Sequence, residues 1–216
     1  MKKIYILCFS LLMLSCDIQY EGDNRLMIRG KVIDKEGNPI SNLEVITNVS
    51  NGNGWGSRSE DIGIDITDIQ GSFTMFFPKP KGEIAYSVQF RDYDELYQDK
   101  RFVNIFFEDF SNLEYNLQEV KLYKKEDIVN LQLNFSTENF SKEIRDLNLI
   151  GEASNDMVWV NPLDDDNYYT QYFYQVIKNQ TITIEYNVYD YSNHQTTIHT
   201  ETIYIADEDL SYIITY

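Results

Sequence analysis

LMIRGKVIDKEGNPI, residues 26–40, decides the fold of this chain of 216 residues. Its first part predicts a strand with Ile28, Gly30 and Val32 on one face, because consecutive side chains of a strand point to opposite faces. Residues 35–40 predict a turn, because glycine readily takes a positive φ and proline fixes φ at about −65°. A strand that ends in a tight turn is typical of an antiparallel β-sheet.

The same alternation of short strands and polar turns continues to residue 123. Ile62, Ile64 and Ile66 alternate with smaller or polar residues, as in a strand. The tight turn Asp68–Gly71 leads into a strand whose Phe73 is expected to anchor the core. Strands are also predicted at residues 43–47, 62–67, 72–78, 85–90, 102–107 and 117–123. About seven strands at this spacing predict an antiparallel β-sandwich.

Several motifs of this region occur in a fixed order: Arg29–Asp34, Gly37–Ile40, Val45 and Thr67–Phe73. In this order they resemble the carboxypeptidase regulatory-like domain, and the resemblance covers residues 26–122. That module is a seven-stranded β-sandwich of transthyretin-like, or prealbumin-like, topology, so the resemblance implies such a domain at residues 26–123. The module accompanies metallocarboxypeptidases but does not itself cut peptides, and the chain has no His-x-x-Glu zinc pattern. The resemblance therefore implies a fold and no activity.

A charged cluster at Lys124–Asp127 interrupts the hydrophobic pattern and predicts a domain boundary. After it, Val129, Leu131 and Leu133 alternate on one face of a predicted strand. Further strands are predicted at residues 147–153, 157–160, 169–177, 181–191, 196–206 and 212–216. We therefore expect a second β-sandwich, immunoglobulin-like in general style, at residues 124–216.

The N-terminus has the layout of a secretory signal. Lys2 and Lys3 precede the apolar run Ile4–Leu14, which is too short to span a bilayer as a permanent helix. The ending Leu-Met-Leu-Ser-Cys at residues 12–16 resembles the lipobox of bacterial lipoproteins. The resemblance implies a signal peptide at residues 1–15, and a lipidated tether at residues 16–25.

The lipobox resemblance also implies that Cys16 carries fatty acyl chains such as palmitate and holds the protein to a membrane. Three acyl chains anchor a protein firmly in a bilayer, whereas a single acyl chain holds it only marginally. The expected location is the cell envelope and, within it, the outer membrane, with the protein on either its periplasmic or its outer surface. The only other cysteine, Cys8, lies in the predicted signal, so no disulfide is expected.

The chain is strongly acidic, with a formal net charge of −17. Such a charge opposes binding to nucleic acid, where affinity rests on Lys and Arg at phosphates, and docking on anionic lipid through a basic patch. Aromatic residues make up 14% of the chain, with 17 tyrosines, which is unlike a disordered protein. The composition predicts a folded protein whose partners are not nucleic acids.

Aromatic side chains are the best candidates for binding. Trp55 lies between glycines in a loop predicted at residues 48–59, where a sandwich would present it to a partner. A second candidate is a tyrosine cluster formed by Tyr168, Tyr169, Tyr172 and Tyr174. The alternative explanation for these tyrosines is that they form a covered face of a sheet.

Polar candidates are weaker. The acidic run Asp164–Asp166 contains ligands that Ca²⁺ accepts, but it lacks the spacing of an EF-hand loop, so a solvated loop is favoured and no metal is expected. The same holds for Asp207–Asp209. His194 and His199, the only histidines, are five residues apart and do not form a paired metal site.

The sequence favours a non-catalytic binding or assembly role for a membrane-anchored lipoprotein. No nucleophile elbow, paired histidines or free cysteine supports an enzyme, and no cofactor is predicted. The expected partners are the bilayer, through Cys16, and a protein or glycan. Two alternatives remain open: an envelope hydrolase acting on glycans or peptides, and an accessory subunit of an outer-membrane uptake system.

Overall fold

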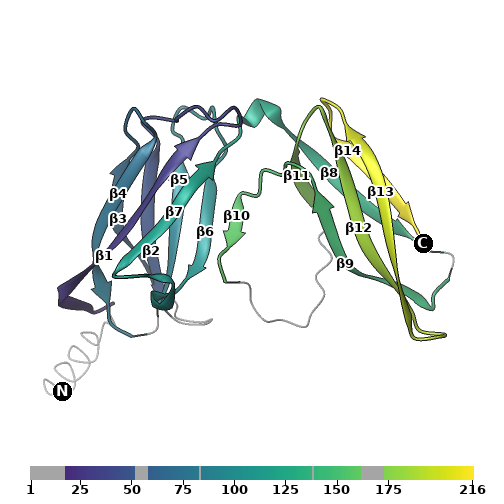
Figure 1. Cartoon of the computed structure of the whole chain (residues 1–216), viewed down its shortest axis with the longest axis horizontal. Coiled ribbons are helices and arrows are strands. Elements are labelled where there is room, and N and C mark those ends of the chain that lie inside the picture. The colour runs from purple at the N-terminus through teal and green to yellow at the C-terminus, as the bar shows by residue number, and fades with distance from the viewer. Residues whose placement is uncertain (1–17, 52–57, 83, 138, 162–172) are drawn as a thin grey trace, which may run out of the picture.

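The computed structural model describes residues 18–51, 58–82, 84–137, 139–161 and 173–216. These residues form an all-β protein of two lobes, joined at one end and diverging from there (Figure 1). Two single turns of 3₁₀ helix, Phe107–Asp109 and Lys125–Asp127, are the only helical elements among them. No helix in the described part of the chain is long and apolar enough to cross a membrane.

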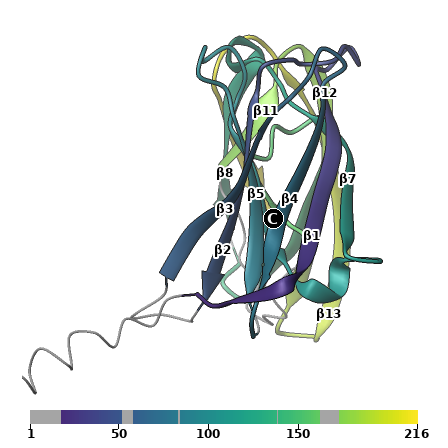
Figure 2. The same ribbon diagram turned by 90° about the vertical axis from the view of Figure 1, so that its left-hand side faces the viewer.

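The first lobe is a sandwich of two sheets. One sheet has the order β4-β1-β7, formed by β1 (Tyr20–Ile33), β4 (Ser72–Pro80) and β7 (Glu114–Lys121). The other has the order β10-β6-β5-β2-β3, formed by β2 (Glu44–Asn51), β3 (Arg58–Ile66), β5 (Ala85–Arg91), β6 (Lys100–Ile105) and β10 (Met157–Trp159). Figure 2 shows the lobe from its free side, where β1 begins at the lower end. Because β7 runs parallel to β1, the sandwich is mixed rather than purely antiparallel.

The core of the first lobe lies between these sheets and follows the predicted alternation. Ile28 and Val32 are fully buried, as the strand pattern predicts. Gly30, on the same face, lies against the Phe73 ring, which is 3.0 Å from where a Cβ on Gly30 would be. The close approach that a glycine permits inside a strand is therefore confirmed here. The alternating isoleucines of β3 do not all contribute to this core, because Ile64 and Ile66 are exposed and lie on the outer face of the sheet.

The second lobe is a smaller sandwich of two three-stranded sheets. One has the order β11-β8-β14, formed by β8 (Ile128–Ser136), β11 (Phe173–Ile177) and β14 (Leu210–Thr215). The other has the order β13-β12-β9, formed by β9 (Lys142–Ile150), β12 (Gln180–Asp190) and β13 (Gln195–Ile205). Leu131, Ile184 and Ile205 are fully buried in its separate core.

Two expectations about the organisation are wrong. The strand at residues 157–160, expected in the second sandwich, is β10, and it pairs in parallel with β6 of the first lobe. Residues 20–25, expected in a polar tether, begin β1, where Tyr20 pairs with Pro80. Ile18 is also buried in the first core, so apolar packing orders this segment despite its polar composition.

Candidate binding surface

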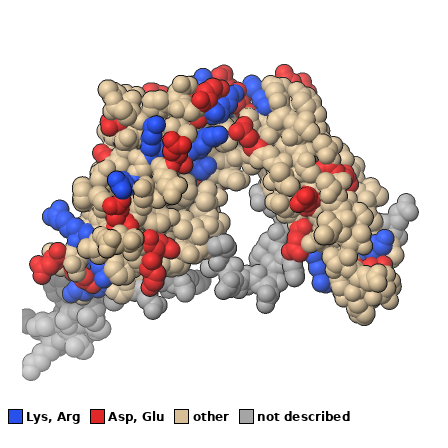
Figure 3. All heavy atoms as spheres, in the orientation of Figure 1, with Lys and Arg blue, Asp and Glu red and all other residues tan. Residues whose placement is uncertain are grey.

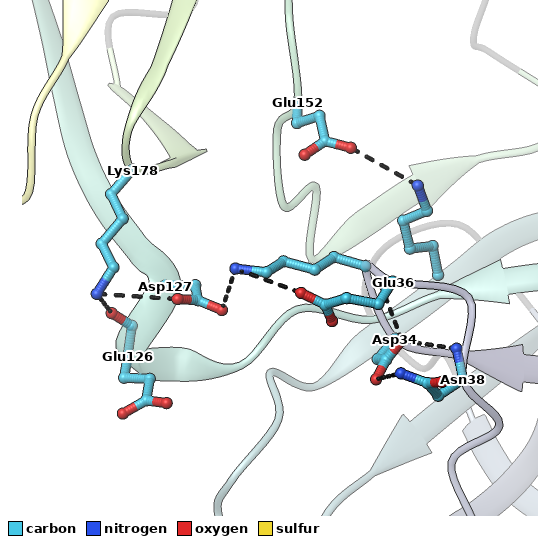
Figure 4. Close-up of polar contacts among 9 residues, drawn as sticks. Asp34, Glu36, Asn38, Glu126, Asp127, Glu152 and Lys178 are labelled. Atoms are coloured by element: carbon cyan, nitrogen blue, oxygen red, sulfur yellow. Dashed lines mark hydrogen bonds and ion pairs between the residues drawn. The ribbon is translucent and has the colours of Figure 1, made fainter.

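Ion pairs join the two lobes (Figure 4). Lys35, in the turn after β1, donates to the carboxylate of Asp127 at 2.8 Å. Lys178 lies 3.8 Å from the same carboxylate and donates to the backbone carbonyl of Glu126 at 2.8 Å. Only 13% of the Asp127 side chain is exposed, so two cations from different lobes share one largely buried carboxylate.

Backbone contacts of the segment before β10 reinforce this junction. The Gln98 side chain donates to the carbonyl of Ser154 at 2.6 Å, and the Arg101 backbone donates to the carbonyl of Asp156 at 2.7 Å. Lys100 also reaches the Ser154 carbonyl, at 3.4 Å, and its burial lowers the pKa of its ammonium group. The Arg101 bond continues the pairing of β6 with β10, and the Gln98 and Lys100 side chains hold the segment before β10 against the first lobe.

A rigid turn presents Lys35 to this junction. Asp34 accepts hydrogen bonds from the backbone and the side chain of Asn38, at 2.8 and 3.0 Å. Burial raises the pKa of the Asp34 carboxyl, but these hydrogen bonds outweigh it, and the pKa is lowered overall. A peripheral pair, Lys121 with Glu152 at 3.6 Å, completes the contact (Figure 4). The junction is thus structural: its charges are paired with one another.

Figure 3 shows a hollow between the lobes below the junction. On the face drawn there, basic and acidic side chains are interspersed over the first lobe and the junction, with no large region of one sign. A charged docking patch is therefore not evident on this face, and binding is better sought among aromatic side chains.

An aromatic cluster lies at the end of the second lobe remote from the junction. It is formed by Glu143, Arg145, Tyr189, Tyr191 and His194, which we call the tyrosine platform. β12 starts near the junction and runs eleven residues to Asp190, so the hairpin that follows it forms the free end of the lobe (Figure 1). Lys142, the first residue of β9, pairs with Asp190 there. Pairing of β9 with β12 brings the platform residues together.

The platform is held by contacts within the chain. The Arg145 guanidinium lies 3.9 Å above the centre of the Tyr189 ring, and the rings of Tyr189 and Tyr191 meet edge to face at 4.9 Å. The Tyr191 hydroxyl donates to Glu143 at 2.5 Å and accepts from Arg145 at 3.2 Å. This hydrogen bond to Tyr191 is the main cause that raises the pKa of Arg145. The hydroxyl of Tyr189 bonds with Nδ1 of His194 at 2.8 Å.

These contacts orient both rings: the Arg145 guanidinium covers one face of the Tyr189 ring, whereas Tyr191 remains 48% exposed. A tyrosine ring offers an apolar face and a polar edge, and Arg and Glu beside it offer hydrogen bonds of both kinds. A ring held in place before binding loses less entropy when a partner arrives. The platform can therefore stack on a sugar ring or anchor a protein partner.

One sequence signal could have identified this platform. Tyr189 and Tyr191 are two residues apart and share a face at the end of a predicted strand. The contribution of β9 depends on the register that places Glu143 opposite Tyr189 and Arg145 opposite Asn187, with an irregularity at Tyr186. No local pattern specifies that register.

Most residues that the sequence singled out lie outside the described residues: Cys16, Trp55, Asp164–Asp166, Tyr168, Tyr169 and Tyr172. Of the second tyrosine cluster, only Tyr174 is described. It lies on β11, packs against the core of the second lobe, and has a pKa raised by burial. Tyr174 therefore serves packing.

The two histidines lie in different environments. His199 stacks on Tyr186 with ring centres 5.3 Å apart, whereas His194 lies in the turn at the free end with a φ of 56°. Asp209 accepts two hydrogen bonds from Asn130, so it too has a structural role. Among the described residues, no group of three or more His, Cys, Asp or Glu side chains is placed to hold a metal ion.

A cavity of about 240 Å³ lies in the first lobe, lined on one side by Phe106, Phe107 and Tyr86. The chain's own Lys79 already lies over the Phe107 ring at 3.9 Å and pairs with Glu21 at 3.1 Å. Burial raises the pKa of Tyr86 to about 12. Because the chain's own Lys79 covers the Phe107 ring, and Phe106 and Phe107 are less exposed than Tyr191, the cavity is a weaker candidate than the tyrosine platform.

No family model matches the chain, and no curated protein matches it. Among solved structures, it is similar to the shaft pilin SpaA from Lactobacillus rhamnosus GG, with 9% identity over 89% of this chain and 98% of that chain, and a TM-score of 0.35. It is similar to the tip fimbrial protein Mfa3 from Porphyromonas gingivalis, with 8% identity over 83% and 82% of the two chains, and a TM-score of 0.30.

A further match is a 9R-lipoxygenase from Cyanothece PCC8801, with 15% identity and a TM-score of 0.28. That match covers 54% of this chain, which spans only 20% of the length of the lipoxygenase. TM-scores this low support no conclusion about the function of this chain.

Proposed function

We propose that this chain is a lipid-anchored protein of the bacterial cell envelope, with a non-catalytic binding or assembly role. The observation that carries the binding role is the exposed tyrosine platform at the free end of the second lobe, held in place by Arg145 and Glu143. Its proposed partner is a protein or a glycan, because both are bound through desolvated aromatic rings flanked by polar groups.

The order of charges and apolar residues at residues 2–16 supports anchoring through Cys16. Ile18 is buried in the first core, and a chain spans at most about 3.6 Å per residue. A lipid on Cys16 would therefore hold the first lobe directly against the membrane, most specifically the outer membrane. Because β1 begins on the side of the molecule where the β12–β13 hairpin lies, the platform would meet partners near the membrane surface (Figure 1).

Cys16→Ser is expected to release the protein from the membrane fraction or to leave its signal uncleaved, because the acyl chains are the proposed anchor. The measurement is fractionation of cells followed by mass spectrometry of the N-terminus. Cys8→Ser, within the predicted signal, is the matched control and should stay with membranes. If Cys16→Ser is cleaved and fractionates with membranes as the parent does, the lipid anchor is excluded.

Tyr191→Ala is expected to weaken partner binding about tenfold or more, as truncation of an exposed aromatic anchor does. Stability should change by less than about 1 kcal/mol, because half of the ring is already in water. The probes are a glycan array and purified envelope proteins recovered by pull-down with the parent protein. Tyr93→Ala is the matched control, since Tyr93 is exposed and lies beside Arg91 on the first lobe.

Equal binding by the parent and by Tyr191→Ala would remove the platform as the site. Trp55→Ala, measured with the same probes, then tests the other binding residue that the sequence proposes. Loss of binding in Trp55→Ala alone would move the site to Trp55.

A further inference from the structure

β13 is a long edge strand with one paired side. All eleven of its residues pair with β12 without interruption, from Gln195 opposite Asp190 to Ile205 opposite Gln180. No strand among the described residues pairs with its other side. In an antiparallel strand alternate residues direct both backbone groups to one side, so the free edge offers N–H donors and C=O acceptors along about 36 Å.

Most other edge strands of the described chain contain charges or prolines or are very short, and β13 is the longest edge strand without such protection. Proteins protect sheet edges with charges, prolines, bulges or short strands. β4 contains Pro78 and Pro80, and β10 and β11 have three and five residues. β3, β7 and β9 carry several charged residues each: Arg58, Glu60, Asp61 and Asp65; Glu114, Glu119 and Lys121; Lys142, Glu143, Arg145 and Asp146. β14 is uncharged but has six residues.

β13 has no lysine, arginine or proline, and its single acid is not free. Glu201 accepts hydrogen bonds from the hydroxyls of Tyr186 at 2.8 Å and Tyr212 at 2.6 Å. On the outer face, Ile198 is 74% exposed and Tyr204 is 61% exposed. In a chain with a net charge of −17, this neutral edge is a place where another acidic molecule can approach without repulsion.

The sequence of β13 is complementary to itself when two copies run antiparallel about Thr200, its central residue. That register places Ile198 opposite Thr202, so an exposed apolar side chain meets a β-branched one. It also places His199 opposite Glu201, and no like charges face each other. A two-fold axis makes each contact occur twice.

We propose that β13 is a self-association edge, where two copies of this chain pair antiparallel about Thr200 and join their β13-β12-β9 sheets into one continuous sheet. Within the molecule, β10 extends a sheet of the first lobe by strand addition as well, there in parallel orientation. The dimer uses backbone hydrogen bonds for affinity and the neutral outer face for selectivity. It leaves the tyrosine platform free, because that cluster is formed by β9, the end of β12 and the turn that follows, away from the unpaired edge of β13.

Ile198→Lys tests the interface. Sedimentation of the full-length protein in density-matched detergent should show a dimer for the parent at about 100 µM, and an increase in the dissociation constant of about tenfold or more for the variant. Ile64→Lys is the matched control, because Ile64 is an exposed isoleucine on another edge strand, and it should leave the dimer intact. A parent that stays monomeric, or a dimer that both variants retain, overturns the proposal.

Single cysteines test the register in native membranes. In Thr200→Cys the two introduced residues face each other, with Cα atoms about 4.5 to 5.5 Å apart, within the range of a disulfide. In Thr202→Cys they are four residues out of register and about 13 Å apart. Mild oxidation should link Thr200→Cys into a covalent dimer well above the level seen in the parent, and should not link Thr202→Cys. The reverse result overturns this register. If the parent is monomeric and the Ile198→Lys variant loses binding to a different protein, self-association is overturned.

Discussion

Gly71→Ala is expected to lower the free energy of unfolding of the first lobe by about 3 to 4 kcal/mol. Gly71 has a φ of 75°, which costs a residue with a side chain about 1 to 2 kcal/mol. An added Cβ would also lie 2.3 Å from the carbonyl oxygen of Val32, so the backbone must move. That movement disturbs the bonds from Val32 to the Gly71 carbonyl at 2.7 Å and from Ile40 to the Val32 carbonyl at 3.0 Å, about 1 kcal/mol each.

Gly37→Ala separates the two causes. Gly37 has a φ of 87°, but nothing lies within 4 Å of where its Cβ would be, so only the conformational cost applies. Urea unfolding followed by circular dichroism measures both variants. Equal losses for Gly71→Ala and Gly37→Ala would show that the contact with Val32 is relieved without cost, and that this turn does not determine the packing of the sandwich.

Local patterns predicted the first lobe well because its turns are held by hydrogen bonds between residues close in sequence. Asp68 accepts hydrogen bonds from the backbone of Gln70 and Ser72, at 2.9 and 2.8 Å, and Gly71 supplies the positive φ that follows. The turn therefore forms from residues close in sequence, and it directs Phe73 into the core beside Gly30. The motif, the turn and the strand that follows agree with one another, which makes such a segment predictable.

Pairing between distant segments was not predictable in the same way. β10 has only three residues, and its alternation fits an edge of either lobe equally well. It pairs with β6 because Ser154 and Asp156 are bonded to Gln98 and Arg101 on the first lobe. The tyrosine platform has the same origin, since Arg145 and Tyr189 are brought together by the register of β9 against β12.

The exposed isoleucines show where alternation alone misleads. Ile64 and Ile66 alternate as core residues would, yet both face solvent, while Ile46 on the neighbouring strand is buried on the same outer face opposite Ile64. A period of two identifies a strand but not which face is covered. The partner sheet decides that, and its position depends on the whole chain.

Phe90→Ala is expected to cost the first lobe about 3 to 5 kcal/mol, as large aromatic truncations in cores do. Phe90 is fully buried, and its ring meets the rings of Phe73 and Phe102 edge to face, at 5.4 and 6.0 Å. Removing it leaves a cavity and deletes both aromatic contacts, each worth about 0.5 to 1.5 kcal/mol beyond the area buried. Calorimetry of the parent and the variant measures the shift.

The same variant tests how strongly the lobes depend on each other. Each lobe has its own core, and they share the short pairing of β10 with β6, the Lys35–Asp127–Lys178 contact, the Lys121–Glu152 pair and the side-chain bonds to Ser154. Because these links are few and partly exposed, we expect two transitions in the variant, with the second lobe shifting by less than half as much as the first. Ile184→Ala, in the fully buried core of the second lobe, should give the reverse order. A single unfolding transition, shifted in both variants, would mean that the chain is one cooperative unit. The predicted boundary at Lys124–Asp127 would then not separate two domains.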